Sequence, residues 1–351
     1  MLIKVLVVDD STMAREKLIY LLSSDPEIEV IDAVRNDMDA LAAVEKHKPD
    51  LIIMDIHRPT ANSFEISRLI METFPTPIVI VTVEDQAVGL DPIEAGALAI
   101  VPRPFGPGHQ EQPAMSRQLL ETVRLMSEVK VVRRWPKKPS AKNGRPAPAG
   151  ELPPVRPRAT PIRVVAIGTS TGGPAALRTL LSGLPKDFAV PVLVVQHIAE
   201  GFMESFVRWL GEACNRPILL VKDKMLIQMG NIYLAPDGYQ MSVENNGHLS
   251  LKAGISENGL CPSVSYLFRS LIRVYGPQVI GILLTGMGKD GAKELAELHE
   301  LGALTIAQDK ASSVIHGMPG EAIRLGGVSH VLSLDEIASF IVRSVAESTS
   351  K

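Results

Sequence analysis

Short runs of Val, Ile and Leu, each followed by an amphipathic stretch, recur on both sides of a central proline-rich segment. Near-continuous apolar strands that alternate with helices are typical of parallel sheets covered by helices on both faces. The pattern therefore predicts an α/β chain with two doubly wound parallel-sheet domains. The runs interpreted as strands are IKVLVVDD, IEVIDAV, DLIIMD, PIVIVT and ALAIVPRP, then RVVAIG, VPVLVVQH, QVIGILLTG and ALTIAQD. Helices are expected near residues 13–23, 37–47, 63–73, 173–182, 201–213, 290–300 and 334–346.

The central segment, residues 130–158, reads KVVRRWPKKPSAKNGRPAPAGELPPVRPR. It holds nine Lys or Arg residues, one Glu and seven prolines, and it lacks an apolar period that could form a core. We interpret it as an extended linker kept soluble by its charge; the alternative is a patch that binds nucleic acid or an acidic partner. The expected domains are residues 1–125 and 161–351, joined by a linker over 126–160.

The overall composition argues against several classes of protein. A net charge of -3 over 351 residues gives no general attraction for nucleic acid or membrane surfaces. The two cysteines, Cys214 and Cys261, are too few for a disulfide framework or a cysteine metal site. No apolar run approaches the roughly 20 residues of a membrane helix, and the first residues lack a signal-peptide layout. We therefore expect a cytoplasmic protein that does not bind nucleic acid.

Polar side chains follow the predicted strands of the first domain. They are Asp9, Asp10, Asp55, Thr82 and Arg103. Because the carboxyl ends of parallel strands meet at one sheet edge, the three acids should lie together, and Mg²⁺ would relieve their repulsion. A carboxylate beside Mg²⁺ can attack a phosphoryl group, whose oxygens Thr82 and Arg103 could bind. The alternative is that each Asp only caps the helix after it.

This order of residues resembles the receiver domain of two-component response regulators, over roughly residues 1–125. The resemblance implies a flavodoxin-like fold and a histidine kinase as phosphodonor. It also implies that Asp55 is the phospho-acceptor, with Asp9, Asp10 and Asp55 as the Mg²⁺ site and Thr82 and Arg103 as switch residues.

The chain departs from the receiver pattern in two places. Arg103, in VPRPF, stands where receivers carry Lys. In the loop DIHRPTANSFE, Arg58 replaces a Met and Ser63 replaces a Gly. An Arg keeps the positive charge of Lys but is bulkier and has a different geometry.

The second domain carries GTSTG, residues 168–172, between a predicted strand and a predicted helix. This G-x-S-x-G spacing can hold Ser170 on a tight turn with its hydroxyl exposed, in front of helical N–H groups that can bind an oxyanion. A phosphate cradle or a plain tight turn would explain the same glycines. The motif alone therefore leaves the role of Ser170 open.

A serine nucleophile needs a base, and the base needs an acid that orients it. Of the eight histidines, His197 ends a predicted strand directly after the serine unit, and His316 in SVIHGMPG is the other candidate. For the acid, both Asp290 and Asp309 follow predicted strands. The flexible glycines of TGMGKDGA favour Asp290, since they can bring further N–H groups to the site.

A second resemblance covers about residues 161–348, through the motifs AIGTSTGGP, VVQH, YLAPDGY, GILLTGMGKDGA, TIAQD and GMPGEAI. These resemble the catalytic domain of chemotaxis-type protein-glutamate methylesterases, the CheB family, in which a receiver precedes a Rossmann-like hydrolase domain. The resemblance implies Ser170 as nucleophile, His197 as base and Asp290 as orienting acid, with the backbone N–H groups at Thr171 and Met287 as oxyanion donors.

The same resemblance implies a reaction and partners. Glutamate γ-methyl esters on the cytoplasmic helices of chemoreceptors would be hydrolysed, and glutamine side chains there deamidated. Catalysis would need no cofactor, and the chain would approach the membrane only through the receptors. The receiver would block the cleft and release it when phosphorylated.

Two departures and a rival interpretation accompany this resemblance. In LCPSVSYLF, Cys261 replaces an Arg of the family and Ser265 replaces an Asp, which points to altered substrate choice or a chemosensory pathway other than flagellar chemotaxis. Cys261 as the nucleophile is a less favoured alternative, because a small buried Cys is the usual case. The rival function is a response regulator whose second domain is a non-catalytic binding or scaffold module.

Overall fold

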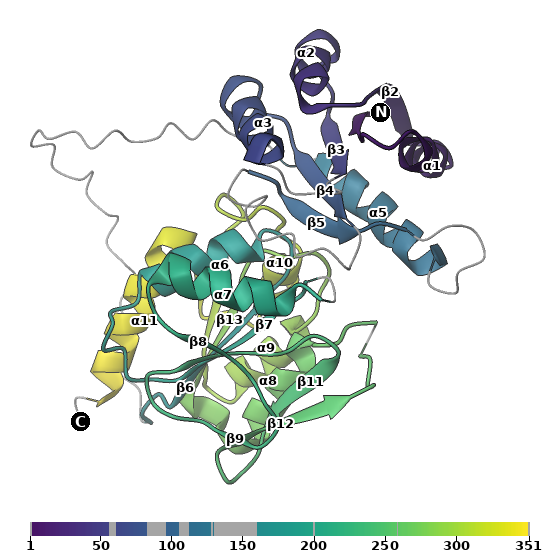
Figure 1. The fold of residues 1–351 in the computed structure, drawn as a ribbon. Helices are drawn as coiled ribbons and strands as arrows, with labels where there is room; N and C mark the ends of the chain where they lie inside the picture. Colours follow the sequence, from purple (N-terminus) through teal and green to yellow (C-terminus); the bar gives the residue numbers. More distant parts are fainter. Residues whose placement is uncertain are drawn as a thin grey trace, which may run out of the picture. The chain divides into compact units, whose positions relative to one another are not determined.

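The computed structural model describes residues 2–55, 61–82, 96–104, 112–127, 129, 160–198, 201–257 and 259–349. The chain divides into two compact units, Met1–Gly144 and Arg145–Lys351 (Figure 1). Most of the predicted linker, residues 130–159, lies outside the described residues, as does the loop position Arg58.

The first unit contains a five-stranded parallel sheet in the order β2-β1-β3-β4-β5. This is the flavodoxin-like order, so the predicted parallel sheet is confirmed. The strands are β1 (Ile3–Val8), β2 (Ile28–Val34), β3 (Leu51–Asp55), β4 (Ile78–Thr82) and β5 (Ala99–Pro102). The helices are α1 (Thr12–Ser23), α2 (Asp37–His47), α3 (Ala61–Thr73) and α5 (Gln112–Ser127). The last helix continues two residues past the boundary predicted at residue 125.

The core of this unit follows from side-chain periodicity. Alternate residues of a strand face the same side of the sheet, and Ile52 and Met54 of β3 lie in one buried cluster. Residues four apart share a helix face, and Ile66 and Ile70 of α3 join the same cluster. Helix α1 begins at Ser11, whose side chain accepts a hydrogen bond from the N–H of Ala14.

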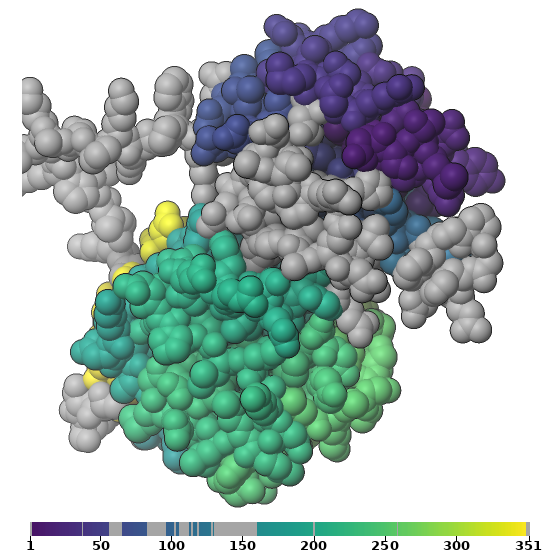
Figure 2. Space-filling view, viewed as in Figure 1, coloured from purple at the N-terminus to yellow at the C-terminus, as the bar shows by residue number. Residues whose placement is uncertain are grey.

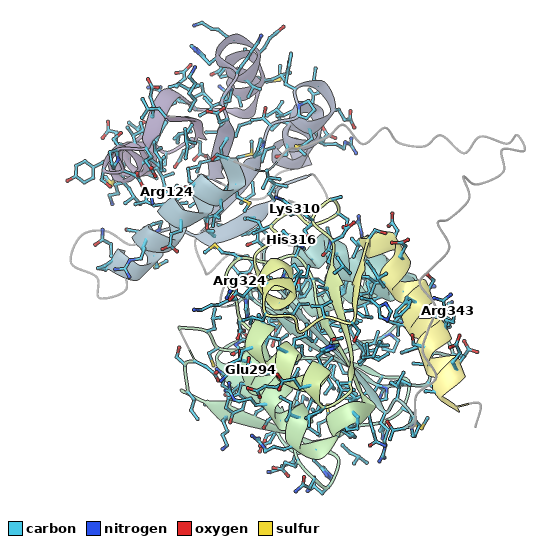
Figure 3. All side chains as sticks on the ribbon, turned by 180° about the vertical axis from the view of Figure 1, so that it is seen from behind. Arg124, Glu294, Lys310, His316, Arg324 and Arg343 are labelled. Atoms are coloured by element: carbon cyan, nitrogen blue, oxygen red, sulfur yellow. The ribbon has the colours of Figure 1, made fainter. Side chains whose placement is uncertain are left out.

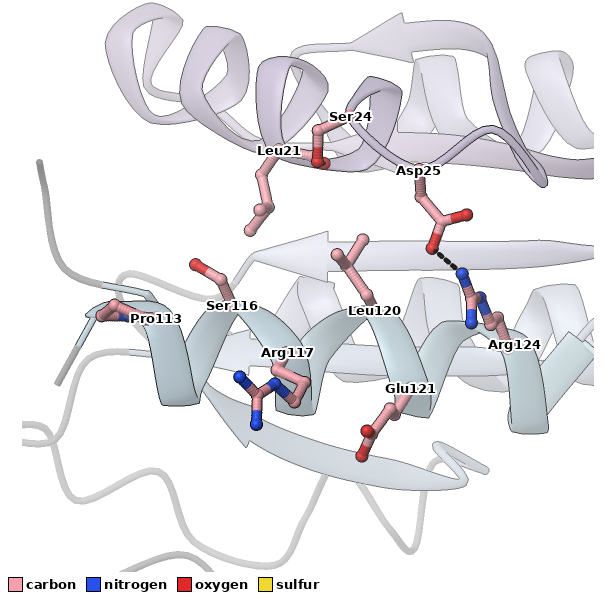
Figure 4. A pocket seen from close by; sticks show the side chains of 9 residues that line it. All are labelled: Leu21, Ser24, Asp25, Pro113, Ser116, Arg117, Leu120, Glu121 and Arg124. Atoms are coloured by element: carbon pink, nitrogen blue, oxygen red, sulfur yellow. Dashed lines mark hydrogen bonds and ion pairs between the residues drawn. The ribbon is translucent and has the colours of Figure 1, made fainter.

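An open pocket of about 350 Å³ lies between helices α1 and α5 (Figure 4). At one side Arg124 of α5 forms an ion pair with Asp25, with 2.6 Å between Nη2 and Oδ2. This hydrogen bond lowers the pKa of Asp25, and the charge of Arg124 adds to the effect. None of the predicted site residues lines this cavity.

The second unit contains a seven-stranded parallel sheet in the order β15-β14-β13-β6-β7-β10-β8. The chain leaves β6 toward β7 on one side and returns to β13 on the other, so the topological switch point lies beside β6. The strands are β6 (Val164–Thr169), β7 (Val192–Gln196), β8 (Ile218–Leu220), β10 (Ile232–Leu234), β13 (Val279–Leu283), β14 (Leu304–Gln308) and β15 (His330–Leu332). All residues of β6, β7, β13 and β14 are buried, as their apolar runs predict.

Helices cover both faces of this sheet (Figure 1). Helix α6 contacts α7 and α11, while α9 contacts α8 and α10. The helices are α6 (Gly173–Ser182), α7 (Met203–Cys214), α8 (Val264–Val274), α9 (Ala292–Glu300), α10 (Met318–Arg324) and α11 (Leu334–Thr349), with a 3₁₀ turn at Gly276–Gln278. In Figure 2 the teal and green segments of this unit form one continuous, closely packed surface.

A small antiparallel sheet is added to the second unit. Its strands β9 (Met225–Leu226), β11 (Tyr239–Val243) and β12 (His248–Ala253) pair in the order β11-β12-β9. Strands β11 and β12 form an antiparallel hairpin, and His248 is the first residue of β12. The sequence analysis missed strands β8, β9 and β10 and helices α5, α8 and α10. Among the described residues, no helix is both long and apolar enough to cross a membrane.

Candidate active site

Three loops meet at the carboxyl edge of the second sheet, beside the switch point. Ser170 follows β6, His197 follows β7, and Asp290 lies in the loop between β13 and α9. Strand β6 pairs directly with both of the other strands. The three residues therefore reach the position where ligands bind in doubly wound folds.

The imidazole of His197 contacts the carboxylate of Asp290. Their Nε2 and Oδ2 atoms lie 3.0 Å apart, and the two side chains are 12% and 5% exposed. With Nε2 engaged in this way, Nδ1 is the ring nitrogen that remains for another partner. Of the two acids that the sequence left open, Asp290 is the one that contacts His197.

Asp290 is held by the beginning of helix α8. Its Oδ2 accepts the N–H of Val264 at 2.6 Å, and its Oδ1 accepts the N–H of Ser265 at 3.0 Å and the hydroxyl of Ser263 at 2.9 Å. Burial by itself raises the pKa of Asp290. The hydrogen bond and charge of His197 and the hydrogen bonds of Ser265 outweigh burial and lower that pKa to about 2.

The loop that carries Ser170 is tied to the loop after β13. The N–H of Ser170 donates to the carbonyl of Thr285 at 3.1 Å, and the hydroxyl of Thr285 donates to the carbonyl of Thr171 at 2.9 Å. Gly172 has φ 78°, a left-handed conformation that glycine adopts without strain. Gly172 therefore does serve a tight turn, and Ser170 in this turn is half-buried.

Gln196, which the sequence analysis did not single out, connects the serine and histidine loops. Its Nε2 donates to the carbonyl of Ser170 at 2.9 Å and to the carbonyl of His197 at 2.7 Å. The side chain is 1% exposed. The signal in the sequence was a lone amide at the end of an otherwise apolar strand, where a buried polar group needs partners.

The two predicted oxyanion donors follow residues that touch each other. Thr171 follows Ser170 and Met287 follows Gly286, and a Cβ atom on Gly286 would lie 2.8 Å from the Cβ of Ser170. Only a glycine allows this approach. Neither the N–H of Thr171 nor that of Met287 donates to another residue within the described part of the chain. Both N–H groups can therefore donate a hydrogen bond to an acceptor atom of a ligand.

The other candidates from the sequence have different partners. His316 lies in the loop between β14 and α10 (Figure 3), with its Nε2 3.1 Å from the carbonyl oxygen of Gln308. Asp309 accepts the hydroxyl of Ser312 at 2.6 Å.

Ser265, at a position of departure from the family, accepts the N–H of Gly291 at 2.9 Å with its hydroxyl oxygen, and its own N–H donates to Asp290. Ser265 therefore stabilises the loop that carries Asp290 through two hydrogen bonds.

The predicted residues of the first unit also gather at a sheet edge. Asp9 and Asp55 have fully buried side chains, and Arg103 forms an ion pair with Asp55 and lies 4.0 Å from Asp9. Thr82 is buried, and its carbonyl accepts the N–H of Arg103 at 2.7 Å. Asp10, by contrast, is exposed.

Two of the three acids of the predicted metal site, Asp9 and Asp55, lie beside the guanidinium of Arg103. In the described part of the chain, no three His, Cys, Asp or Glu side chains are grouped so that they could hold a metal ion. The Mg²⁺ site at Asp9, Asp10 and Asp55 remains a prediction from the sequence.

Comparison with known proteins identifies both units. Residues 165–341 match the family model described as CheB methylesterase, which covers more than half of the chain, and residues 5–112 match that of the response regulator receiver domain. The chain belongs to the CheB methylesterase family. Both resemblances recognised in the motifs are thereby confirmed.

Members of the CheB family resemble this chain over nearly its whole length. The protein-glutamate methylesterase/protein-glutamine glutaminase of Nitrosospira multiformis is 51% identical over 350 residues, which are 99% of this chain and 98% of that protein. A protein of the same name, numbered 1, from Syntrophus aciditrophicus is 45% identical over 97% of this chain and 98% of its own length. The crystal structure of the Thermotoga maritima CheB methylesterase catalytic domain is 31% identical, with a TM-score of 0.50, and the match covers 52% of this chain and 98% of that one.

Proposed function

We propose that this chain hydrolyses γ-methyl esters of glutamate side chains on the cytoplasmic helices of chemoreceptors, and deamidates glutamine side chains there. The observation that carries the proposal is the contact of 3.0 Å between His197 and Asp290, beside the Ser170 loop. The names of the relatives support the reaction, since both are protein-glutamate methylesterases/protein-glutamine glutaminases.

The proposed reaction begins with proton transfer from the Ser170 hydroxyl to Nδ1 of His197, because Nε2 is engaged by Asp290. The serine oxygen attacks the ester carbonyl, and the oxyanion receives hydrogen bonds from the N–H groups of Thr171 and Met287. Asp290, ionised far below neutral pH, stabilises the imidazolium that forms.

The tetrahedral intermediate collapses as the imidazolium of His197 returns its proton to the leaving methoxide, and methanol departs. Water then attacks the acyl-enzyme, again with His197 as base, and releases the glutamate carboxylate and Ser170. A glutamine substrate gives the same acyl-enzyme with ammonia as the leaving group, so one site serves both reactions.

The proposed regulation uses the first unit. A histidine kinase phosphorylates Asp55, and the modification shifts the population from a state with a blocked cleft to a state with an open one. The match to the receiver family supports this part of the proposal.

The test is release of methanol from methylated chemoreceptor membranes by the full chain and by Ser170→Ala. We expect release by the full chain and a loss on the order of 10⁴-fold or more in the variant, since an acyl-enzyme can no longer form. Ser182→Ala is the matched control, because Ser182 is an exposed serine of the same unit outside the site.

Two further arms complete this experiment. Addition of a small phosphodonor should increase methanol release, and Asp55→Asn should remove that increase. If the full chain binds the receptors but releases neither methanol nor ammonia, the second unit acts as a binding module and the hydrolase proposal is wrong.

A further inference from the structure

A guanidinium group occupies the acidic edge of the first sheet. Nη2 of Arg103 forms an ion pair with the carboxylate of Asp55 and lies 4.0 Å from Oδ2 of Asp9. The side chains of both acids are 0% exposed, and that of Arg103 is 18% exposed. One nitrogen atom thus faces both buried carboxylates.

The two oxygens of Asp9 have different surroundings. Oδ1 accepts the N–H of Ser11 at 2.8 Å, in the turn that begins helix α1. Oδ2 is the oxygen near Arg103. A second guanidinium lies close by, since Nη1 of the buried Arg15 donates to the main-chain carbonyl of Asp9 at 2.8 Å. Positive charge from this chain therefore already lies around the Asp9 and Asp55 side chains, which together are called the Asp9–Asp55 pocket below.

A divalent cation needs the position that Arg103 holds. Mg²⁺ binds its oxygen ligands at about 2.0–2.1 Å in an octahedron, so two carboxylate oxygens on one ion lie only about 3 Å apart. A guanidinium nitrogen between the carboxylates of Asp9 and Asp55 prevents this approach. It also neutralises part of the charge that would attract the cation.

The identity of the residue matters as much as its charge. A Lys ammonium is a compact, strongly hydrated charge on a flexible stem, which can withdraw toward solvent when a metal ion enters. An Arg presents a planar fork of donors that suits carboxylates, is more weakly hydrated, and keeps buried ion pairs more readily. Arg103 is therefore harder to displace from Asp55 than a Lys would be.

We propose that Arg103 is a built-in counter-ion of the Asp9–Asp55 pocket, which competes with divalent cations and makes their binding weak. A cation binds tightly only when the guanidinium has left Asp55. The inference uses the receiver part of the proposed function, in which this pocket is the phosphorylation site, and it is independent of the esterase reaction.

The test is titration of the full chain with Mg²⁺ by calorimetry, and with Mn²⁺ followed by the electron paramagnetic resonance of the free ion. We expect Arg103→Lys to bind either ion at least about tenfold more tightly than the unmodified chain, about 1.4 kcal/mol in binding free energy. Arg68→Lys is the matched control: Arg68 is exposed on α3, and this variant should bind like the unmodified chain.

Two more variants locate the effect. Arg103→Met, which removes the competing charge, should also bind more tightly than the unmodified chain, and adding Asp9→Asn to Arg103→Lys should abolish the gain. Circular dichroism checks that each variant is folded. Equal affinity of the unmodified chain and Arg103→Lys, or a gain that survives Asp9→Asn, overturns the proposal. Since no arm depends on methanol release, failure of the esterase proposal leaves this result interpretable.

Discussion

Each of the two units places a buried carboxylate beside a basic side chain at the carboxyl edge of its sheet, but the surroundings differ. Asp290 receives N–H groups and a hydroxyl from the start of α8, and its basic partner is a histidine. Asp55 is paired with an arginine that stays charged at any working pH. The hydrogen bond and charge of His197, together with the hydrogen bonds of Ser265, keep Asp290 ionised. In the first unit, by contrast, the permanently charged Arg103 is paired with Asp55, the acid that a phosphoryl group would modify.

Among the changes that test this comparison, the largest expected effect comes from removing the charge of Asp290. Asp290→Asn should lower kcat for methanol release by on the order of 10⁴-fold, the loss known for the corresponding acid of a serine protease triad, because Asn no longer fixes the required tautomer of the imidazole. Asp309→Asn is the control and should retain nearly full activity, since Asp309 contacts Ser312 rather than His197. Comparable losses in the two variants would contradict the assignment of Asp290.

A smaller effect concerns stability and pH. The pKa of Asp290 falls from an ordinary 3.8 to about 2 on folding, which corresponds to about 2 kcal/mol of stability. Because the folded-state pKa is the lower one, this contribution is complete well above pH 4 and is lost as the pH falls toward 2. Urea unfolding at pH 6, 4 and 3 should therefore show the unmodified chain losing stability faster than Asp290→Asn. Parallel curves would mean that His197 and the donors of α8 do not favour the ionised form of Asp290.

The smallest effect isolates one of those donors. Ser263 caps helix α8 through the N–H of Tyr266 and donates its hydroxyl to Asp290. Ser263→Ala should reduce the free energy of unfolding by about 1 kcal/mol, the usual value of a lost cap. Ser263→Thr keeps the hydroxyl and should restore most of the stability. If Ala and Thr are equally stable, the hydroxyl does not hold Asp290.

Much of the fold could be predicted because strand and helix signals are local. The apolar runs marked the strands that carry Ser170, His197 and Asp290 at their ends, and the rule for doubly wound sheets brought these ends together. Helix α8 was missed although its signal was present. Val264, Leu267, Phe268 and Leu271 are all fully buried at helical spacing after a capping serine.

The missed contacts have another cause. Gln196 is an ordinary polar residue in the sequence, and its role appears only when the carbonyls of Ser170 and His197 lie on either side of its amide. The donors of Asp290 come from a segment that precedes it by about 25 residues, with β13 between them. Spacing along a chain does not encode contacts of this kind.

The sequence by itself determined the two parallel sheets, the strand ends that carry chemistry and the family, because periodicity and motifs depend on neighbouring residues. Tertiary structure alone decided the partners of each charged group. It placed Asp290 rather than Asp309 beside His197 and brought the N–H groups of α8 to that carboxylate. It also paired Arg103 with Asp55. A buried charge is defined by the few atoms around it, and in this chain those atoms come from distant segments.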